Sequence, residues 1–213
     1  MNFQDRKQAG QLLAKKLKVT RLPKNLIVLA IPRGGVVVGK ELVGILGCPL
    51  DVIVTKKIGA PANPELAVGA VGPIGEPVVN EKLATQVGAD EKYLQSQISK
   101  LQTEIKRREK RFRADKQSLN LKNKQVIITD DGVATGATMA AAVEIVRQQE
   151  PKRIIVAVPV IAQDTLAKIE NLADEVIYLQ APKLFFAVGQ FYRDFKQVED
   201  REVIQLLGSG GEL

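Results

Sequence analysis

Apolar residues in this chain form short continuous runs that alternate with stretches of helical periodicity. Continuous runs are typical of strands buried on both faces of a parallel sheet, because such strands have no solvent-facing side. The runs predict strands at 26–31, 50–57, 126–130, 153–161 and 174–179. Apolar residues at helical spacing predict helices at 5–17, 35–47, 91–113, 137–149 and 164–173. This order of elements predicts an α/β fold with a mainly parallel sheet flanked by helices.

The segment 57–80 departs from this alternation. It is rich in glycine and proline, which favour turns and extended backbone over long regular elements. Two short apolar stretches, LAVGAV and EPVVN, predict a hairpin within it. We therefore expect an extended excursion from the core between the second strand and the long helix.

Composition narrows the class of protein. A chain of 213 residues fits a single α/β domain. No apolar run approaches the roughly 20 residues that cross a bilayer, and the N-terminus has no apolar signal core, so we expect a cytoplasmic protein. The chain has no histidine, which excludes imidazole acid–base catalysis and histidine-ligated zinc. The net charge of +7 is concentrated in residues 100–124, with ten basic and three acidic residues.

The stretch VIITDDGVATGAT, residues 126–138, combines two kinds of ligand-binding group. The small residues of 132–137 let backbone amides approach a ligand, and the loop leads into a helix N-terminus that favours an anion such as phosphate. Thr135 and Thr138 add hydroxyl groups. Asp130 and Asp131 accept hydrogen bonds from hydroxyl groups or bind a metal. A phosphate beside two vicinal hydroxyl groups describes a ribose 5-phosphate.

This stretch resembles the phosphoribosyl diphosphate signature of the type I phosphoribosyltransferases. The resemblance implies that Asp130 and Asp131 hold the ribose hydroxyls. It also implies that the 5-phosphate is wrapped by Ala134, Thr135, Gly136, Ala137 and Thr138. Ala134 departs from the family, where many members carry threonine. The chain lacks GK[ST] and a first-unit GxGxxG, which excludes a Walker A loop and a Rossmann fingerprint.

The resemblance extends over most of the chain. The segments around IPRGG and KKIGAPANPELA, and the tail AVGQFYRDFKQVEDREV, are similar to a stand-alone bacterial subgroup known mainly as predicted phosphoribosyltransferases. It implies one domain over 1–213, with a core at about 26–180 and a mobile loop at about 55–80. A small hood is implied from 1–25 and 181–213.

The hood segment is rich in aromatic residues, since five of the nine in the chain follow Ala181. We expect most of them to pack the hood against the core and at most one to stack on the acceptor.

The stretch IPRGG places Arg33, Gly34 and Gly35 after the first strand. A fixed cation beside two exposed backbone amides suits a diphosphate, although a turn with a surface arginine is the alternative. The matching loop of the family contacts diphosphate and often holds a non-proline cis peptide bond.

The segment 55–67 corresponds by resemblance to the loop that closes over the bound donor. Lys56 and Lys57 are expected to neutralise the leaving diphosphate. Glu65 is a candidate to orient the acceptor or take its proton, with a solvated surface position equally open.

These observations predict transfer of 5-phosphoribose from phosphoribosyl diphosphate to a nitrogen-containing, nucleobase-like acceptor, with release of diphosphate. Mg²⁺ is the expected cofactor, held through the ligand and through water at Asp130 and Asp131 rather than by direct side-chain ligation. The sequence does not identify the acceptor. By analogy with the family we expect a homodimer.

Two other functions remain open. The first is a non-catalytic sensor of phosphoribosyl diphosphate or a nucleotide that binds nucleic acid through the basic stretch 100–124. A solvated helix face is the favoured interpretation of that stretch. The second is transfer or phosphorolysis on a different ribosyl phosphate, which the IPRGG loop disfavours.

Overall fold

A five-stranded parallel sheet forms the centre of the structure, a computed structural model that describes residues 2–19, 25–73, 75–113 and 116–208. The sheet has the order β2-β1-β6-β7-β8. Its strands are β2 (Leu50–Val52), β1 (Leu26–Ala30), β6 (Gln125–Thr129), β7 (Arg153–Val160) and β8 (Glu175–Gln180). All four neighbouring pairs are parallel. The expected α/β fold is therefore confirmed.

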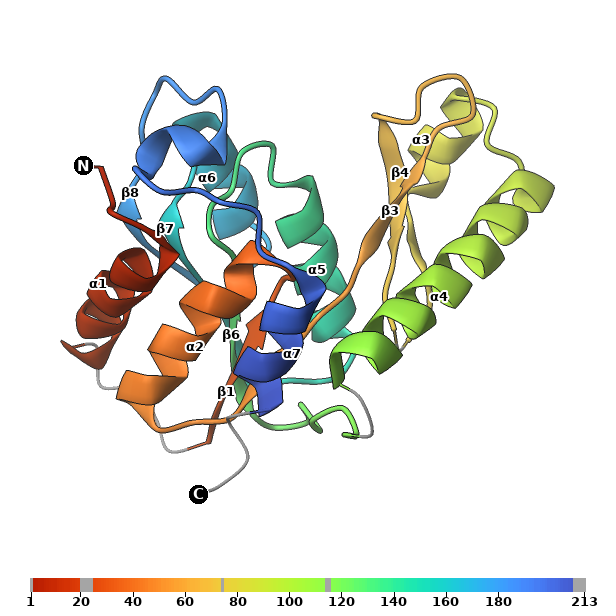
Figure 1. The fold of residues 1–213 in the computed structure, drawn as a ribbon. Helices are drawn as coiled ribbons and strands as arrows, with labels where there is room; N and C mark the ends of the chain where they lie inside the picture. Colours follow the sequence, from red (N-terminus) through yellow and green to blue (C-terminus); the bar gives the residue numbers. More distant parts are fainter. Residues whose placement is uncertain (1, 20–24, 74, 114–115, 209–213) are drawn as a thin grey trace.

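Helices cover both faces of this sheet (Figure 1). Alternate strand residues such as Val28, Ile127 and Ile155 pack with helices α1 (Arg6–Val19) and α2 (Gly34–Leu46). The residues between them pack on the opposite face with α5 (Ala137–Arg147) and α6 (Gln163–Glu170). Burial on both faces explains why the strands are continuous apolar runs.

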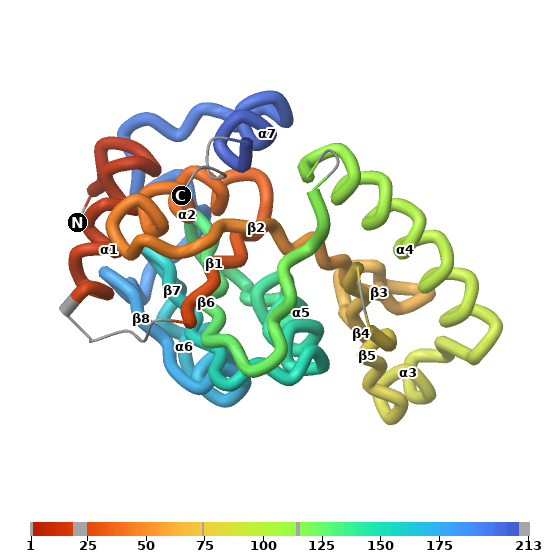
Figure 2. The backbone as a smooth tube through the Cα atoms, turned by 90° about the horizontal axis from the view of Figure 1, so that it is seen from below, coloured from red at the N-terminus to blue at the C-terminus, as the bar shows by residue number. Residues whose placement is uncertain are grey.

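Residues 56–113 form a second unit, here called the arm, that projects beside α5 (Figures 1 and 2). It contains a separate antiparallel sheet of β3 (Lys56–Gly59), β4 (Ala67–Val71) and β5 (Val78–Val79). Helices α3 (Glu81–Gln86) and α4 (Glu91–Arg113) complete it. The predicted hairpin is confirmed, since β4 pairs with β5.

The prediction of one strand over 50–57 is wrong. The chain leaves the parallel sheet after Val52 and begins the arm at Lys56. Residues 51–55 are buried throughout, so the hydrophobic pattern carried no sign of the change of sheet.

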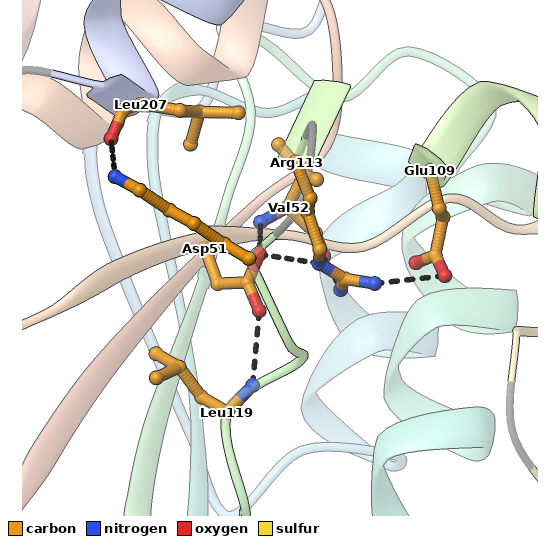
Figure 3. Close-up of polar contacts among 7 residues, drawn as sticks. Asp51, Val52, Glu109, Arg113, Leu119 and Leu207 are labelled. Carbon is orange, nitrogen blue, oxygen red and sulfur yellow. Dashed lines mark hydrogen bonds and ion pairs between the residues drawn. The ribbon is translucent and has the colours of Figure 1, made fainter. Parts of the chain in front are cut away.

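A buried ionic cluster ties the base of the arm to the core (Figure 3). Arg113 of α4 lies 2.7 Å from Asp51 of β2 and 2.8 Å from Glu109. Its guanidinium group also donates to the Val52 carbonyl, at 2.8 Å. The Asp51 carboxylate accepts the Leu119 amide, at 3.2 Å. Asp51 thus holds both the segment that enters the arm and the segment that leaves it.

The two ends of the chain pack against each other. Phe3 forms a bridge with Tyr192, and their rings lie 5.3 Å apart. The 3₁₀ helix η1 (Val188–Phe191) precedes this contact, and α7 (Asp200–Gly208) follows it and packs beside α2 and α4. Parts of the predicted hood, residues 1, 20–24 and 209–213, lie outside the described residues. None of the described helices has the length and apolarity needed to cross a membrane.

Candidate functional site

The acidic pair and the IPRGG loop lie against each other at the carboxyl ends of β6 and β1. A Cβ atom added to Gly34 would stand 1.9 Å from Asp131 Oδ2. A Cβ atom added to Gly35 would stand 2.8 Å from Asp130 Cα. Glycine is therefore required at both positions by close approach, since such distances are shorter than any ordinary van der Waals contact. The structure brings the predicted ribose-binding and diphosphate-binding residues together.

Asp131 is held by residues from both ends of the chain. Arg6 Nε donates to Asp131 Oδ2 at 2.7 Å, and both side chains are almost buried. The same guanidinium group donates to the Lys196 carbonyl at 2.8 Å and lies 3.8 Å from the centre of the Phe195 ring. The Tyr192 hydroxyl donates to the Asp131 main-chain carbonyl. One carboxylate oxygen of Asp131 is thus fixed by Arg6.

Asp130 is electrostatically different from its neighbour. Its side chain is partly buried, and its Oδ1 accepts the Asp131 amide at 2.8 Å. Burial raises the pKa of Asp130 well above its usual value, and the nearby Asp131 carboxylate raises it further. Burial likewise raises the pKa of Tyr192, so its hydroxyl remains a hydrogen-bond donor.

The predicted phosphate loop connects β6 to the N-terminus of α5. Gly136 adopts a positive φ of 73° and precedes the first helical residue, Ala137. The Ala134 carbonyl accepts the Thr165 hydroxyl at 2.5 Å, which ties the loop to α6. Thr135 and Thr138 are exposed. The free amides of the first helical turn and two exposed hydroxyls form an anion-binding arrangement.

Arg33 lies at the N-terminus of α2, and the Pro32–Arg33 peptide bond is cis. The family resemblance implied a non-proline cis bond in this loop. A hollow of about 360 Å³ adjoins the acidic pair. It is lined by Arg6, Arg33, Gly34, Asp131, Phe195, Gln197 and Val198. Two arginines therefore face a space beside the predicted ribose site.

The predicted catalytic residues of the arm are only partly brought to this site. Lys57 lies 2.8 Å from Glu65, and Lys56 lies 2.8 Å from Glu104 of α4, so both ion pairs stay within the arm. Lys57 also lines a hollow of about 500 Å³ with Ala137 at the end of the phosphate loop. The roles of Lys56, Lys57 and Glu65 stay predictions.

Sequence reasoning missed Arg6, Tyr192 and Phe195. Arg6 opens the first helix directly after Asp5, which caps it by accepting the Gln8 amide at 2.8 Å. Nothing in the sequence distinguishes Arg6 from the other basic residues of that helix. The sequence predicted that most aromatic residues of the tail pack against the core. It did not predict the contact of Tyr192 with Asp131, because that contact depends on the packing of the tail against the N-terminal segment.

The donors present fit a magnesium ion that arrives with its ligand. Among the described residues no group of three or more acidic or cysteine side chains forms a cage for a metal. Mg²⁺ usually binds through one or two carboxylates together with substrate phosphates and water. Asp130 and Asp131 would hold such an ion through the ligand and through water.

Comparisons with known proteins agree with this geometry. The phosphoribosyl transferase domain model matches residues 2–196. Two curated relatives in strains of Mycobacterium tuberculosis, each named "Putative phosphoribosyl transferase", are 41% identical over 205 residues, 96% of this chain. The chain spans about half, 46%, of their length.

The crystal structure of TT1426 from Thermus thermophilus is 41% identical, with a TM-score of 0.91 over 100% of both chains. AQ2163 from Aquifex aeolicus, at 13% identity and a TM-score of 0.51 over 83% of this chain and 74% of its own, shares the fold. The match over residues 2–196, the similar relatives and the paired Asp130–Asp131 and Gly34–Gly35 together show that this chain belongs to the phosphoribosyl transferase domain family.

Proposed function

We propose that this protein transfers 5-phosphoribose from phosphoribosyl diphosphate to a nitrogen-containing acceptor and releases diphosphate. The observation that carries the proposal is the contact of Gly34 and Gly35 with the residues Asp131 and Asp130. Because of this contact, two carboxyl groups that can accept hydrogen bonds from ribose hydroxyls lie next to the loop that carries Arg33. The anion-binding N-terminus of α5 begins six residues after Asp131, at Ala137.

Each part of the donor has a partner in this arrangement. The loop 134–138 binds the 5-phosphate through amides and threonine hydroxyls. Asp130 and Asp131 accept the two ribose hydroxyls. Arg33 and the amides of Gly34 and Gly35 bind the diphosphate.

The chemistry then depends on charge more than on covalent participation by the protein. As the bond from ribose to diphosphate lengthens, positive charge develops on the sugar ring and negative charge on the leaving group. The Asp131 carboxylate stabilises the former and Arg33 the latter. Arg6 keeps Asp131 oriented, so this carboxylate needs no reorganisation during the reaction. Magnesium bound with the donor would neutralise part of the leaving charge.

The arm and the chain ends supply the remaining functions. Closure of the segment 55–80 over the donor would exclude water, which otherwise hydrolyses it. In the tail, Phe191 and Tyr192 are buried, whereas Phe186 is 86% exposed. Phe186 is therefore our candidate among the tail aromatics to stack on a flat acceptor.

Calorimetric titration with phosphoribosyl diphosphate, with and without Mg²⁺, tests the donor half of this proposal. We expect magnesium-dependent binding that is lost when Asp130 and Asp131 are both replaced by asparagine. The Gly44→Ala variant serves as a control, since Gly44 lies in α2 and a Cβ atom there meets nothing within 4 Å. Binding that survives in the double variant would contradict the site. A panel of nucleobases screened for diphosphate release would then identify the acceptor.

A further inference from the structure

Helix α4 carries an arginine that the proposed function leaves unused. Arg111 Nη1 lies 2.9 Å from Asp200 Oδ2. Arg33 Nη1 lies 3.6 Å from the other carboxylate oxygen, Asp200 Oδ1. A single carboxylate at the start of α7 therefore joins the arginine of the diphosphate loop to an arginine of the arm.

The charges around Asp200 are unbalanced. Two guanidinium groups share one carboxylate, which leaves an excess of positive charge beside the hollow lined by Arg33, Gly34 and Val198. The Arg111 side chain is 64% exposed, so most of its donors face solvent. Guanidinium groups bind phosphate oxygens through paired hydrogen bonds, and several charges on one ligand strengthen this binding. The cluster is therefore suited to an anion that carries more charge than a carboxylate.

The other arginines close to Arg111 in sequence are not placed in this way. Arg113 is engaged by Asp51 and Glu109 at the base of the arm, and it is nearly buried. Arg107 lies one turn earlier on α4 and is exposed. Only Arg111, among the described arginines of α4, shares an ion-pair partner with Arg33.

We propose that Arg111 is a second diphosphate-binding residue, and that diphosphate displaces the Asp200 carboxylate from Arg111 and Arg33 when it binds. This inference rests on the proposed function, because it takes Arg33 as a diphosphate ligand. On binding, the more highly charged diphosphate replaces Asp200 as the partner of both arginines. Because Arg111 belongs to the arm, this exchange also connects the arm to the presence of the donor.

Titration calorimetry on the full chain with three probes tests this inference: inorganic pyrophosphate with Mg²⁺, phosphoribosyl diphosphate with Mg²⁺, and ribose 5-phosphate. Arg111→Gln should weaken pyrophosphate and donor binding about tenfold, the size of one charge-assisted hydrogen bond, and leave ribose 5-phosphate binding unchanged. Arg107→Gln, which removes the same charge from the same helix, should change none of the three. Arg111→Lys should restore part of the affinity because it restores the charge.

Asp200→Asn tests the second half of the inference. Removal of the competing carboxylate should strengthen pyrophosphate binding several-fold. Weaker pyrophosphate binding by Asp200→Asn would contradict the proposal that diphosphate displaces Asp200. It would show instead that Asp200 positions the two arginines for binding. Equal behaviour of Arg111→Gln and Arg107→Gln would overturn the role of Arg111. Thermal melts of each variant separate these results from unfolding.

Failure of the proposed function has a different signature. If the unaltered protein binds neither phosphoribosyl diphosphate nor pyrophosphate, the donor site itself is wrong and the inference falls with it. If the unaltered protein binds both ligands, but Arg111→Gln and Arg107→Gln have the same effect, the proposed function stands and the role of Arg111 is wrong.

Discussion

Gly34 and Gly35 are neighbours in sequence, but a methyl group at each position would meet different atoms. A methyl group on Gly34 collides with Asp131 Oδ2, the oxygen that Arg6 holds, so the Arg6–Asp131 ion pair must shift or break. A methyl group on Gly35 collides with the Asp130 Cα and the Thr129 carbonyl, which belong to the backbone of the core sheet.

We therefore expect Gly34→Ala to abolish measurable donor binding and to lower the free energy of unfolding by no more than loss of the Arg6–Asp131 pair, about 1.5–3 kcal/mol. Gly35→Ala should lower the free energy of unfolding by about 1–3 kcal/mol. Gly44→Ala, in open space on the same helix, should raise it by about 0.5–1 kcal/mol. Urea denaturation and calorimetry on the three variants check this order. Retained binding in Gly34→Ala would show that Asp131 does not contact the donor.

The two aspartates should respond to asparagine substitution with opposite changes in stability. The folded state raises the pKa of Asp130, mainly by burial, so its ionisation destabilises the fold as pH rises above the ordinary carboxyl range. Asp130→Asn removes this cost while keeping the oxygen that accepts the Asp131 amide, and should raise the melting temperature at pH 7. Asp131→Asn removes the charged partner of Arg6 and should cost about 1.5–3 kcal/mol. Melting curves that shift in the same direction would contradict this assignment.

At the residue scale, sequence reasoning selected residues that the structure brings together, but not the residues that hold them in place. Asp130, Asp131, Arg33 and the two glycines were found because their types and spacing are informative within single loops. Arg6 was not found, because its importance arises from a contact across 125 positions of the chain. Asp200 was missed for the same reason.

At the scale of elements, helix α4 contains near its C-terminal end an acidic residue, Glu109, whose pKa is raised. Glu109 is 9% exposed, and burial raises its pKa to about 7, in opposition to the nearby Arg113. One of its carboxylate oxygens, Oε1, is buried, and the other, Oε2, pairs with Arg113. Between its ordinary pKa of 4.5 and about 7, the folded state binds more protons than the unfolded state. Stability is therefore lost as pH rises through this window.

Glu109→Gln should remove this pH dependence. Relative to the variant, the unaltered protein should lose roughly 3 kcal/mol of unfolding free energy between pH 4.5 and pH 7. Urea denaturation at half-unit steps of pH measures the difference. Glu170→Gln, at an exposed position of α6, provides the control and should leave the profile unchanged. A profile that Glu109→Gln does not alter would show that Glu109 stays ionised throughout.

Most elements of the core were predictable because each one has its own hydrophobic periodicity or continuous apolar run. The continuous apolar runs predicted both ends of β1, β6, β7 and β8 within one residue. Helix α7 was not predicted, and neither was the division of 50–57 between two sheets. Both depend on what the segment packs against, which its own sequence does not specify.

At the scale of the whole molecule, the arm is attached to the core at its base and through contacts of β3 and β4 with α5. If this unit closes over the donor, hydrogen exchange should slow for backbone amides within residues 56–71 when phosphoribosyl diphosphate and Mg²⁺ are added. The Asp130/Asp131 double asparagine variant should show no such change. Protection confined to the start of α5 would indicate that the donor binds while the arm stays open.

The pairing of β1 with β6 also bears on how this chain folds. Ile27 lies opposite Val126, so the central strand pair joins residues that are 99 positions apart in sequence. Helix α2, strand β2 and the arm lie between these two strands in the sequence. Closing so long a loop is slow compared with forming local helices and hairpins. During synthesis, β1 can therefore pair only with β2 until the whole arm and β6 have been made. The arm can fold in that interval, before the central sheet that carries the candidate site has formed.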